Sequence, residues 1–172
     1  MMYRFGPFLI AAAVFLIDHL TKFLIRHSNL PEGGFPVIPG FFNIVHNENP
    51  GVAFGLFADS TGPFRAIVLI GLSAAVLIII TVILLKRPQS GELHNWLMRV
   101  ALALVLGGAV GNLYDRIVWG RVTDFIQLHA GTSYYFPDFN VADSCISVGA
   151  ALLSSTCGEA APGAGVRLMH NT

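Results

Sequence analysis

Charge is scarce in this sequence, and no stretch of it is rich in charge of one sign. Charged residues make up 12% of the 172 residues, and the formal net charge is zero. Soluble domains average about 25% charged residues, so this composition indicates a protein that is not surrounded by water. Because no basic block exists, we do not expect nucleic acid as a partner.

Cysteine is equally scarce, with two residues in the whole chain. Cys145 and Cys157 lie twelve residues apart in an apolar stretch. This spacing matches neither a set of metal ligands nor a disulfide framework. We therefore expect both to be small side chains packed in a helix, and we expect neither a metal nor another cofactor.

Apolar residues are abundant and amount to 54% of the chain. They gather in four segments that approach or reach the length needed to cross the ~30 Å hydrocarbon core of a bilayer. Segments that cross lipid must be helical, because an open strand would leave backbone groups unpaired. The last segment is the weakest candidate, since it is short and contains Asp143 and several serines. The predicted spans are residues 5–25, 64–85, about 96–119 and about 139–157.

Lysine and arginine predict how these spans are oriented. The loop from 27 to 64 contains neither residue, whereas the short loop between the second and third spans contains Lys86 and Arg87. The positive-inside rule then places the short loop and both termini in the cytoplasm. A cleaved signal peptide is the competing interpretation of the first segment. Its basic start is Arg4 alone and no small-residue cleavage site follows it, so we expect a retained helix.

The expected fold is an all-α membrane protein with four transmembrane helices in one domain, residues 1–157. The tail, 158–172, lacks periodicity and is predicted to be disordered. Between the first two helices lies an outward excursion rich in glycine, proline and aromatic residues. Within it, "FFNIV" (41–45) and "VAFGLF" (52–57) predict short strands around the turn "NENPG" (47–51). We expect this β-rich piece to lie at the membrane surface.

Ionisable residues inside the predicted spans need a physical reason, because each is costly in lipid unless it faces a protein interior or a polar cavity. Asp18 and Lys22 are four residues apart on one helix face, which predicts an ion pair. Asn112 shares a face with Asp115 and Arg116 through spacings of three and four residues. Their residue types are compatible both with holding helices together and with orienting another group.

Asp124 and Asp143 are predicted to lie at the same outer interface, on adjacent helix ends. The stretch between them is too polar and broken to cross the bilayer, and Asn140 shares a helix face with Asp143. Two carboxylates brought together cannot both ionise easily, so one keeps a proton while the other loses it. This pairing supports the chemistry of aspartic peptidases. A cation site, a proton relay and a structural role stay open from the residues alone.

Four motifs in this order resemble the lipoprotein signal peptidase family (signal peptidase II), which consists of bacterial intramembrane aspartic peptidases. "DHLTK" (18–22) is similar to the family's D-Q-x-T-K signature, with His19 in place of the usual glutamine. "NPGVAFG" (49–55) is similar to its N-x-G-x-A-F element. "GNLYDRIVWGRVTDFI" (111–126) and "FNVAD" (139–143) are similar to the two signatures that each carry one catalytic aspartate. The resemblance covers nearly the whole chain.

The resemblance implies an enzyme that removes the signal peptide from bacterial prolipoproteins, cutting just before the lipid-modified cysteine. It implies action at the outer face of the cytoplasmic (inner) membrane, with Asp124 and Asp143 as the catalytic pair. The implied fold is four helices and a small extracytoplasmic β-cradle, and the implied partners are diacylglyceryl-modified prolipoproteins and membrane lipid. The positions implied to orient the site or contact substrate are Asn112, Asp115, Arg116, Asn140, Asn49, Gly51, Asp18 and Lys22.

The C-terminal end departs from the family pattern. The family usually completes an apolar helix there and closes with basic residues, whereas this chain continues as "TCGEAAPGAGVRLMHNT" (156–172). We therefore expect a short fourth helix. The alternative function of another class is a small proton- or ion-conducting membrane protein that uses the same acids, and an inactive lipid-binding relative is a third.

Overall fold

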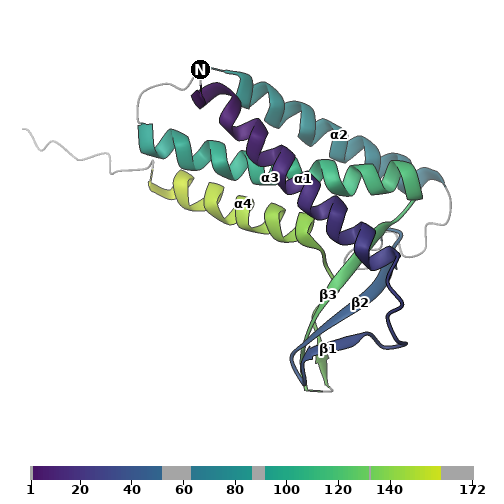
Figure 1. The fold of residues 1–172 in the computed structure, drawn as a ribbon. Coiled ribbons are helices and arrows are strands. Elements are labelled where there is room, and N and C mark those ends of the chain that lie inside the picture. The colour runs from purple at the N-terminus through teal and green to yellow at the C-terminus, as the bar shows by residue number, and fades with distance from the viewer. Residues whose placement is uncertain (1, 52–62, 87–91, 132, 160–172) are drawn as a thin grey trace, which may run out of the picture.

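The computed structural model of the chain describes residues 2–51, 63–86, 92–131 and 133–159. In these residues, four helices pack side by side and a small sheet projects from one end of them (Figure 1). The helices are α1 (Met2–Arg26), α2 (Pro63–Leu85), α3 (Glu92–Trp119) and α4 (Val141–Glu159). Helix α3 lies at the centre, because it packs against each of the other three.

The predicted helices are present close to their expected positions, and three of them have the length of a membrane span. The long apolar stretches are Phe5–Arg26 in α1, Ala66–Leu85 in α2 and Trp96–Trp119 in α3. The apolar part of α4, Val141–Thr156, is shorter. The protein is therefore a multi-pass membrane protein by the length and composition of its helices. Whether α4 also crosses the membrane stays a prediction.

The sheet has four antiparallel strands in the order β1-β2-β3-β4. Strands β1 (Phe35–Ile38) and β2 (Phe42–Asn49) form a hairpin after α1, while β3 (Val122–Ala130) and β4 (Tyr134–Tyr135) follow α3. The strand predicted at 41–45 is confirmed in β2. The turn predicted at 47–51 is partly wrong, because β2 continues through Asn49. The other predicted strand (52–57) and most of the predicted disordered tail lie outside the described residues.

Strand β3 was not expected, because Asp124 was predicted to lie at a helix end and the residues after it in a stretch too polar and broken to cross the bilayer. Its first four residues are all buried, so the alternation that marks a strand with one wet face is absent. Helices α1 and α3 contact this strand, and β2 pairs with it from far away in sequence. The backbone of Ile126 also pairs with Phe139, directly before α4. This pairing brings the start of α4 next to β3.

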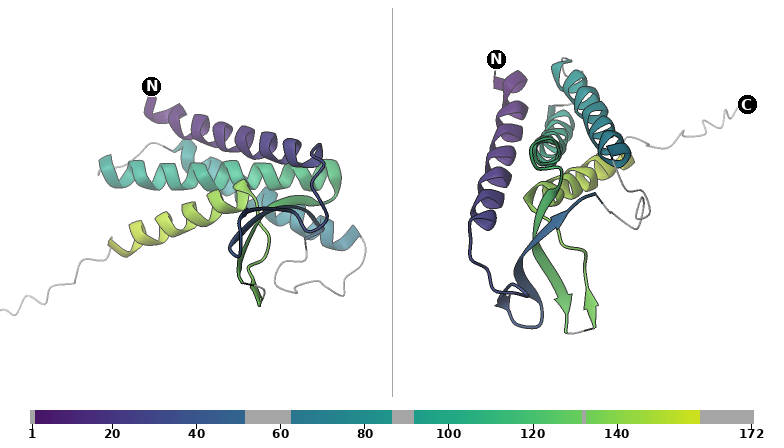
Figure 2. Two further views of the ribbon diagram at one scale, coloured as in Figure 1. Left: turned by 60° about the horizontal axis from the view of Figure 1, so that its bottom comes forward. Right: turned by 90° about the vertical axis from the view of Figure 1, so that its right-hand side faces the viewer.

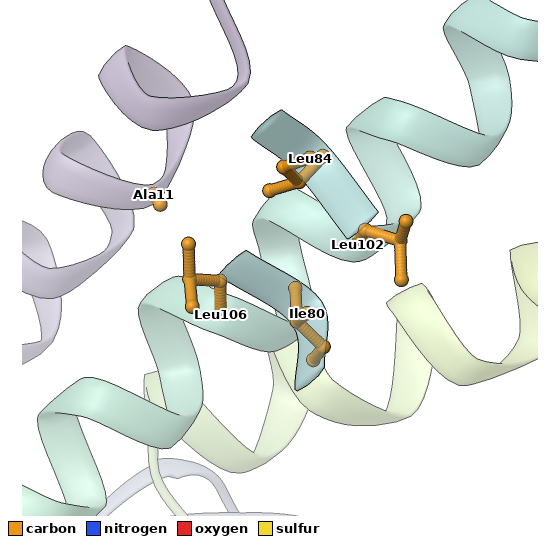
Figure 3. Packing of buried hydrophobic residues seen from close by; sticks show 5 residues of the cluster. All are labelled: Ala11, Ile80, Leu84, Leu102 and Leu106. Atoms are coloured by element: carbon orange, nitrogen blue, oxygen red, sulfur yellow. The ribbon is translucent and has the colours of Figure 1, made fainter. Parts of the chain in front are cut away.

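Apolar side chains from three helices form the core. Leu102 and Leu106 of α3 meet Ile80 and Leu84 of α2, and Ala11 approaches from α1 (Figure 3). Figure 2 shows that the sheet extends beyond the end of the bundle where α1 and α3 finish and α4 begins. The polar residues discussed below gather at that end.

Helices α3 and α4 approach closely at Gly108. A Cβ atom at this position would lie 2.5 Å from the carbonyl oxygen of Ala142 and 2.9 Å from Cγ1 of Ile146. Small residues allow such close packing between helices in membranes. Because Ala142 immediately precedes Asp143, this contact also sets the distance of the Asp143 end of α4 from α3.

We predict that Gly108→Ala forces the two helices apart and lowers stability, because overpacking typically costs about 1–3 kcal/mol. The thermal midpoint in detergent would measure this. Gly71→Ala in α2 is the matched control, since a Cβ at Gly71 has nothing within 4 Å. Equal midpoints for the two variants would contradict the close packing.

Candidate active site

Seven polar side chains are buried together where α1 and α3 end, β3 starts and α4 begins. Figures 1 and 2 show how these elements meet at one end of the bundle. Six of these side chains were singled out in the sequence, and every other site residue predicted there lies beside them. Thr123 was not predicted. The buried side chains are those of Asp18, Lys22, Asn112, Asp115, Thr123, Asp124 and Asn140.

Lys22 is the centre of this cluster. Its Nζ lies 2.7 Å from Oδ2 of Asp18 and 3.0 Å from Oδ2 of Asp115. It also donates a hydrogen bond of 2.9 Å to Oδ1 of Asn112. The predicted Asp18–Lys22 ion pair is confirmed, with Asp115 as a second acidic partner. Burying a lysine in this way is tolerable only because its charge is paired and its protons are directed at oxygen atoms.

The Lys22 ammonium group determines which way the Asn112 amide faces. An ammonium can only donate hydrogen bonds, so Asn112 must turn its oxygen toward Lys22 and its NH₂ group away. That NH₂ group donates to Oδ1 of Asp143 at 2.7 Å. The ammonium group of Lys22 in α1 thereby orients the carboxylate of Asp143 in α4 through the amide of Asn112 in α3.

Asp143 belongs to the N-terminal cap of α4. Oδ1 of Asn140 accepts the backbone N–H of Asp143 at 2.9 Å, and Oδ2 of Asp143 accepts the backbone N–H of Asn140 at 3.3 Å. This reciprocal pair is a capping box. Asp18 accepts a third backbone N–H of the first turn, from Ala142, at 2.9 Å. Asp143 is therefore held at the positive end of a helix and is only partly buried.

Asp124 is held differently, because it lies in strand β3. The expectation of two adjacent helix ends was wrong for this residue. Its side chain is 2% exposed and lies between two amide groups. Asn140 donates from Nδ2 to Oδ1 at 2.7 Å, and Asn49 donates from Nδ2 to Oδ2 at 3.0 Å. Asn49 is itself oriented by the N–H of Gly51, which donates to its Oδ1 at 2.8 Å.

Burial raises the pKa of Asp124 to about 6. Hydrogen bonds from Asn49 and Asn140 oppose the rise, and the negative charge of Asp143 adds to it. The two carboxylates thus act on each other, and both contact Asn140. An arrangement in which one acid holds a proton and its neighbour is ionised can activate water and polarise a carbonyl group at the same time.

Arg116 is the cation of α3 nearest to this pair. Its Nη1 donates to the backbone oxygen of Asn112 at 3.2 Å, and its charge attracts those of Asp143 and Asp124. A second arginine, Arg26, was not predicted. Its Nη2 lies 2.8 Å from Oδ1 of Asp115. A signal for it was present in the sequence, because Arg26 is four residues after Lys22 and therefore shares its helix face.

The charges of the cluster nearly balance. Four acids face three bases, so one bound proton would make the cluster neutral. Charge balance of this kind favours a buried cluster over one with an unpaired charge. The acids are Asp18, Asp115, Asp124 and Asp143, and the bases are Lys22, Arg26 and Arg116.

His19, which departs from the resembled signature, lies outside this network. Its ring centroid is 5.0 Å from that of Tyr114 and 5.8 Å from that of Phe15. The substitution therefore changes an aromatic contact between α1 and α3 and leaves the contacts of the acids described above as they are.

The chain is similar over most of its length to known proteins of one family. The family model described as "Signal peptidase (SPase) II" matches residues 10–157. A lipoprotein signal peptidase of Pseudomonas aeruginosa is 46% identical over 169 residues, which cover 93% of this chain and 97% of the relative. That of Solibacter usitatus is 42% identical, covering 87% of this chain and 88% of the relative.

A solved structure has the same fold. It is described as a bacterial membrane enzyme determined by the in meso method at 2.3 Å resolution. Its TM-score is 0.75 at 32% identity, and the match covers 90% of this chain and 88% of the other. The likeness therefore extends over the helices and the sheet together.

Two substitutions of Asn140 separate its two contacts. Asn140→Ser keeps an oxygen that can cap α4 but loses the donor to Asp124, whereas Asn140→Ala loses both. We predict that both raise the pKa of Asp124, and that only the alanine variant loses the capping contribution of about 1 kcal/mol. Infrared titration of the carboxyl groups and thermal midpoints measure the two effects. A serine variant as unstable as the alanine variant would contradict the capping role.

The raised pKa of Asp124 predicts how stability depends on pH. The pKa is about 6 in the folded protein, whereas the ordinary pKa of an aspartate is 3.8, so the folded state binds the proton more tightly than the unfolded chain. Stability should therefore fall as the pH rises from roughly 4 through 6, by up to about 3 kcal/mol. Thermal midpoints of Asp124→Asn should lack this part of the pH slope. Parallel curves for both proteins would disprove the assignment.

Proposed function

This chain belongs to the signal peptidase II family and, like its members, removes signal peptides from prolipoproteins; we propose that Asp124 and Asp143 are its two catalytic carboxylates. One observation carries the proposal. The side chain of Asn140 donates to Asp124 while it caps the helix turn that holds Asp143. Both acids are thus held around a single amide at one end of the bundle.

The two acids take different parts in the proposed hydrolysis. Asp124 is the more deeply buried, and its raised pKa lets it keep a proton that polarises the carbonyl oxygen of the scissile bond. Asp143 takes a proton from water. The water oxygen attacks the carbonyl carbon, the C–N bond then breaks, and the departing nitrogen receives a proton from the pair. Peptide hydrolysis by paired aspartates needs these two roles.

The other buried groups hold the side chains of Asp124 and Asp143 in fixed orientations. Asn112 directs an N–H at Asp143 because Lys22 holds its oxygen. Asn49 directs an N–H at Asp124 because the N–H of Gly51 holds its oxygen. Arg116 supplies positive charge near both acids. Such fixed donors favour the charge distribution of a transition state without rearrangement during the reaction.

We further propose that all four helices cross the inner membrane and that the sheet lies at its outer surface as a β-cradle. The N-terminus lies at the opposite end of the bundle from the sheet (Figure 1), in agreement with the orientation that the positive-inside rule predicts. The sheet carries exposed aromatic side chains, as the interface favours. These are Phe35, Phe41, Tyr134, Tyr135 and Phe136.

This placement explains why the acids lie at the end of the bundle. A diacylglyceryl-modified prolipoprotein keeps its lipid in the bilayer, while the peptide bond before the modified cysteine lies at the interface. Water reaches that depth and does not reach the bundle centre. Asp143, which is partly buried, lies where water and this peptide bond can meet.

Changing Asp124 or Asp143 separately to asparagine tests the catalytic assignment. We predict that either change lowers cleavage of a purified prolipoprotein by at least about a hundredfold, because general acid–base catalysis contributes that much or more. Folding and substrate binding should persist, as thermal midpoints and binding assays in detergent would show.

Glu32→Gln is the control, because this carboxylate is exposed in the turn before β1. It should cleave at the normal rate. Full activity in Asp124→Asn or Asp143→Asn would refute the assignment. Proton or ion flux in sealed vesicles, without cleavage, would instead support a conducting protein.

A further inference from the structure

The guanidinium group of Arg26 joins three elements at the end of the bundle. Arg26 ends α1, and its Nη2 lies 2.8 Å from Oδ1 of Asp115 in α3. Its Nε donates to Oγ1 of Thr123 in β3 at 2.7 Å. Its Cζ also lies 5.2 Å from the ring centroid of Trp119, over the last turn of α3. A planar guanidinium can meet all three partners at once, which a lysine could not do.

The Arg26 contact determines the direction of the Thr123 hydroxyl group. Arginine can only donate, so Oγ1 of Thr123 accepts from it and turns its own proton elsewhere. That proton goes to Oε1 of Glu48 in β2, at 3.1 Å. Thr123 and Glu48 face each other in the register of the two strands. Thr123, which is fully buried, is thus held from two sides.

Thr123 directly precedes Asp124, so the contact between Arg26 and Thr123 also affects the position of Asp124. Successive side chains of a strand point to opposite faces. Holding Thr123 against α1 on one face therefore directs Asp124 toward the other face, where Asn140 and Asn49 donate to it. None of the described contacts of Arg26 is with Asp124 or Asp143.

We infer that Arg26 is a positioning residue that acts through Thr123 to hold strand β3 in the rotation that presents Asp124 to its two amide donors. The inference rests on the proposed function, since it assumes that Asp124 is catalytic. Three charged groups act directly on Asp124: Asp143 from α4, Arg116 from α3 and Lys22 from α1. Arg26 changes none of them; it sets the geometry in which they act.

The test uses full-length protein and measures prolipoprotein cleavage in Arg26→Met, Thr123→Val and the double variant. Each single change should lower kcat about tenfold, because small misplacements of a catalytic group are costly, and leave KM within about twofold. The double variant should be no worse than the more impaired single variant, because both changes break one path. Thr123→Ser restores the hydroxyl group and should restore kcat.

The pH profile separates positioning from a purely structural role. Weaker amide bonds to Asp124 would raise its pKa, so the pH midpoint assigned to Asp124 should move upward by at least about 0.5 unit in Thr123→Val. Arg121→Met is the control, because Arg121 is exposed and its Nε lies 4.0 Å from Oε2 of Glu48. It should change neither kcat nor the profile.

Several results would overturn the inference. One is a lower thermal midpoint with unchanged kcat and pH profile in the folded fraction. Another is a double variant whose losses multiply. If Arg26→Met does not fold, Thr123→Val and Thr123→Ser decide the question, since valine keeps the shape of threonine. Normal cleavage by Asp124→Asn would instead show that the proposed function itself is wrong.

Discussion

The buried ammonium group of Lys22 is the constraint on which the polar end of this protein depends. A lysine held away from water must be surrounded by oxygen atoms, and here Asp18, Asp115 and Asn112 provide them. Each of the three is then fixed by a second contact. Asp18 binds the first turn of α4, Asp115 binds the last turn of α1, and Asn112 binds Asp143. One cation thereby ties three helices together around the two acids.

The two acids differ because their backbones differ. Asp143 belongs to the first turn of a helix, where the positive end of the helix lies beside a partly buried carboxylate. Asp124 lies in the buried part of a strand, where the amides of Asn140 and Asn49 donate to it. Asn140 contacts both acids, since its side-chain oxygen caps the helix at Asp143 and its side-chain nitrogen donates to Asp124. The residue that caps α4 therefore also connects the two acids.

The helices were predictable and the sheet was largely not. A helix in lipid satisfies its own backbone, so length and apolar composition were enough to predict α1, α2 and α3. A strand needs a partner strand. The partner of β3 is β2, and two helices, α2 and α3, separate them in the sequence. Because the first four residues of β3 are all buried, the stretch V-T-D-F (122–125) also lacked the alternation that would have indicated a strand. Thr123 was overlooked because its contact with Arg26 exists only once β3 lies against α1. Arg26 itself did have a signal in the sequence, since it follows Lys22 by four residues on the same helix face.

The sequence by itself determined which chemistry is available. Acids, amides and cations lie at the ends of its apolar segments, where polar groups are costly unless they have a structural or catalytic role. The spacing of Asp18 and Lys22 predicted their ion pair. Only the tertiary structure decided how the two aspartates differ. Asp124 and Asp143 are chemically identical side chains, and nothing local marks one as the acid that holds a proton. Burial raises the pKa of Asp124, and the amides of Asn49 in β2 and of Asn140 before α4 oppose that rise. The groups that surround Asp124 are close to it in space but come from different parts of the sequence.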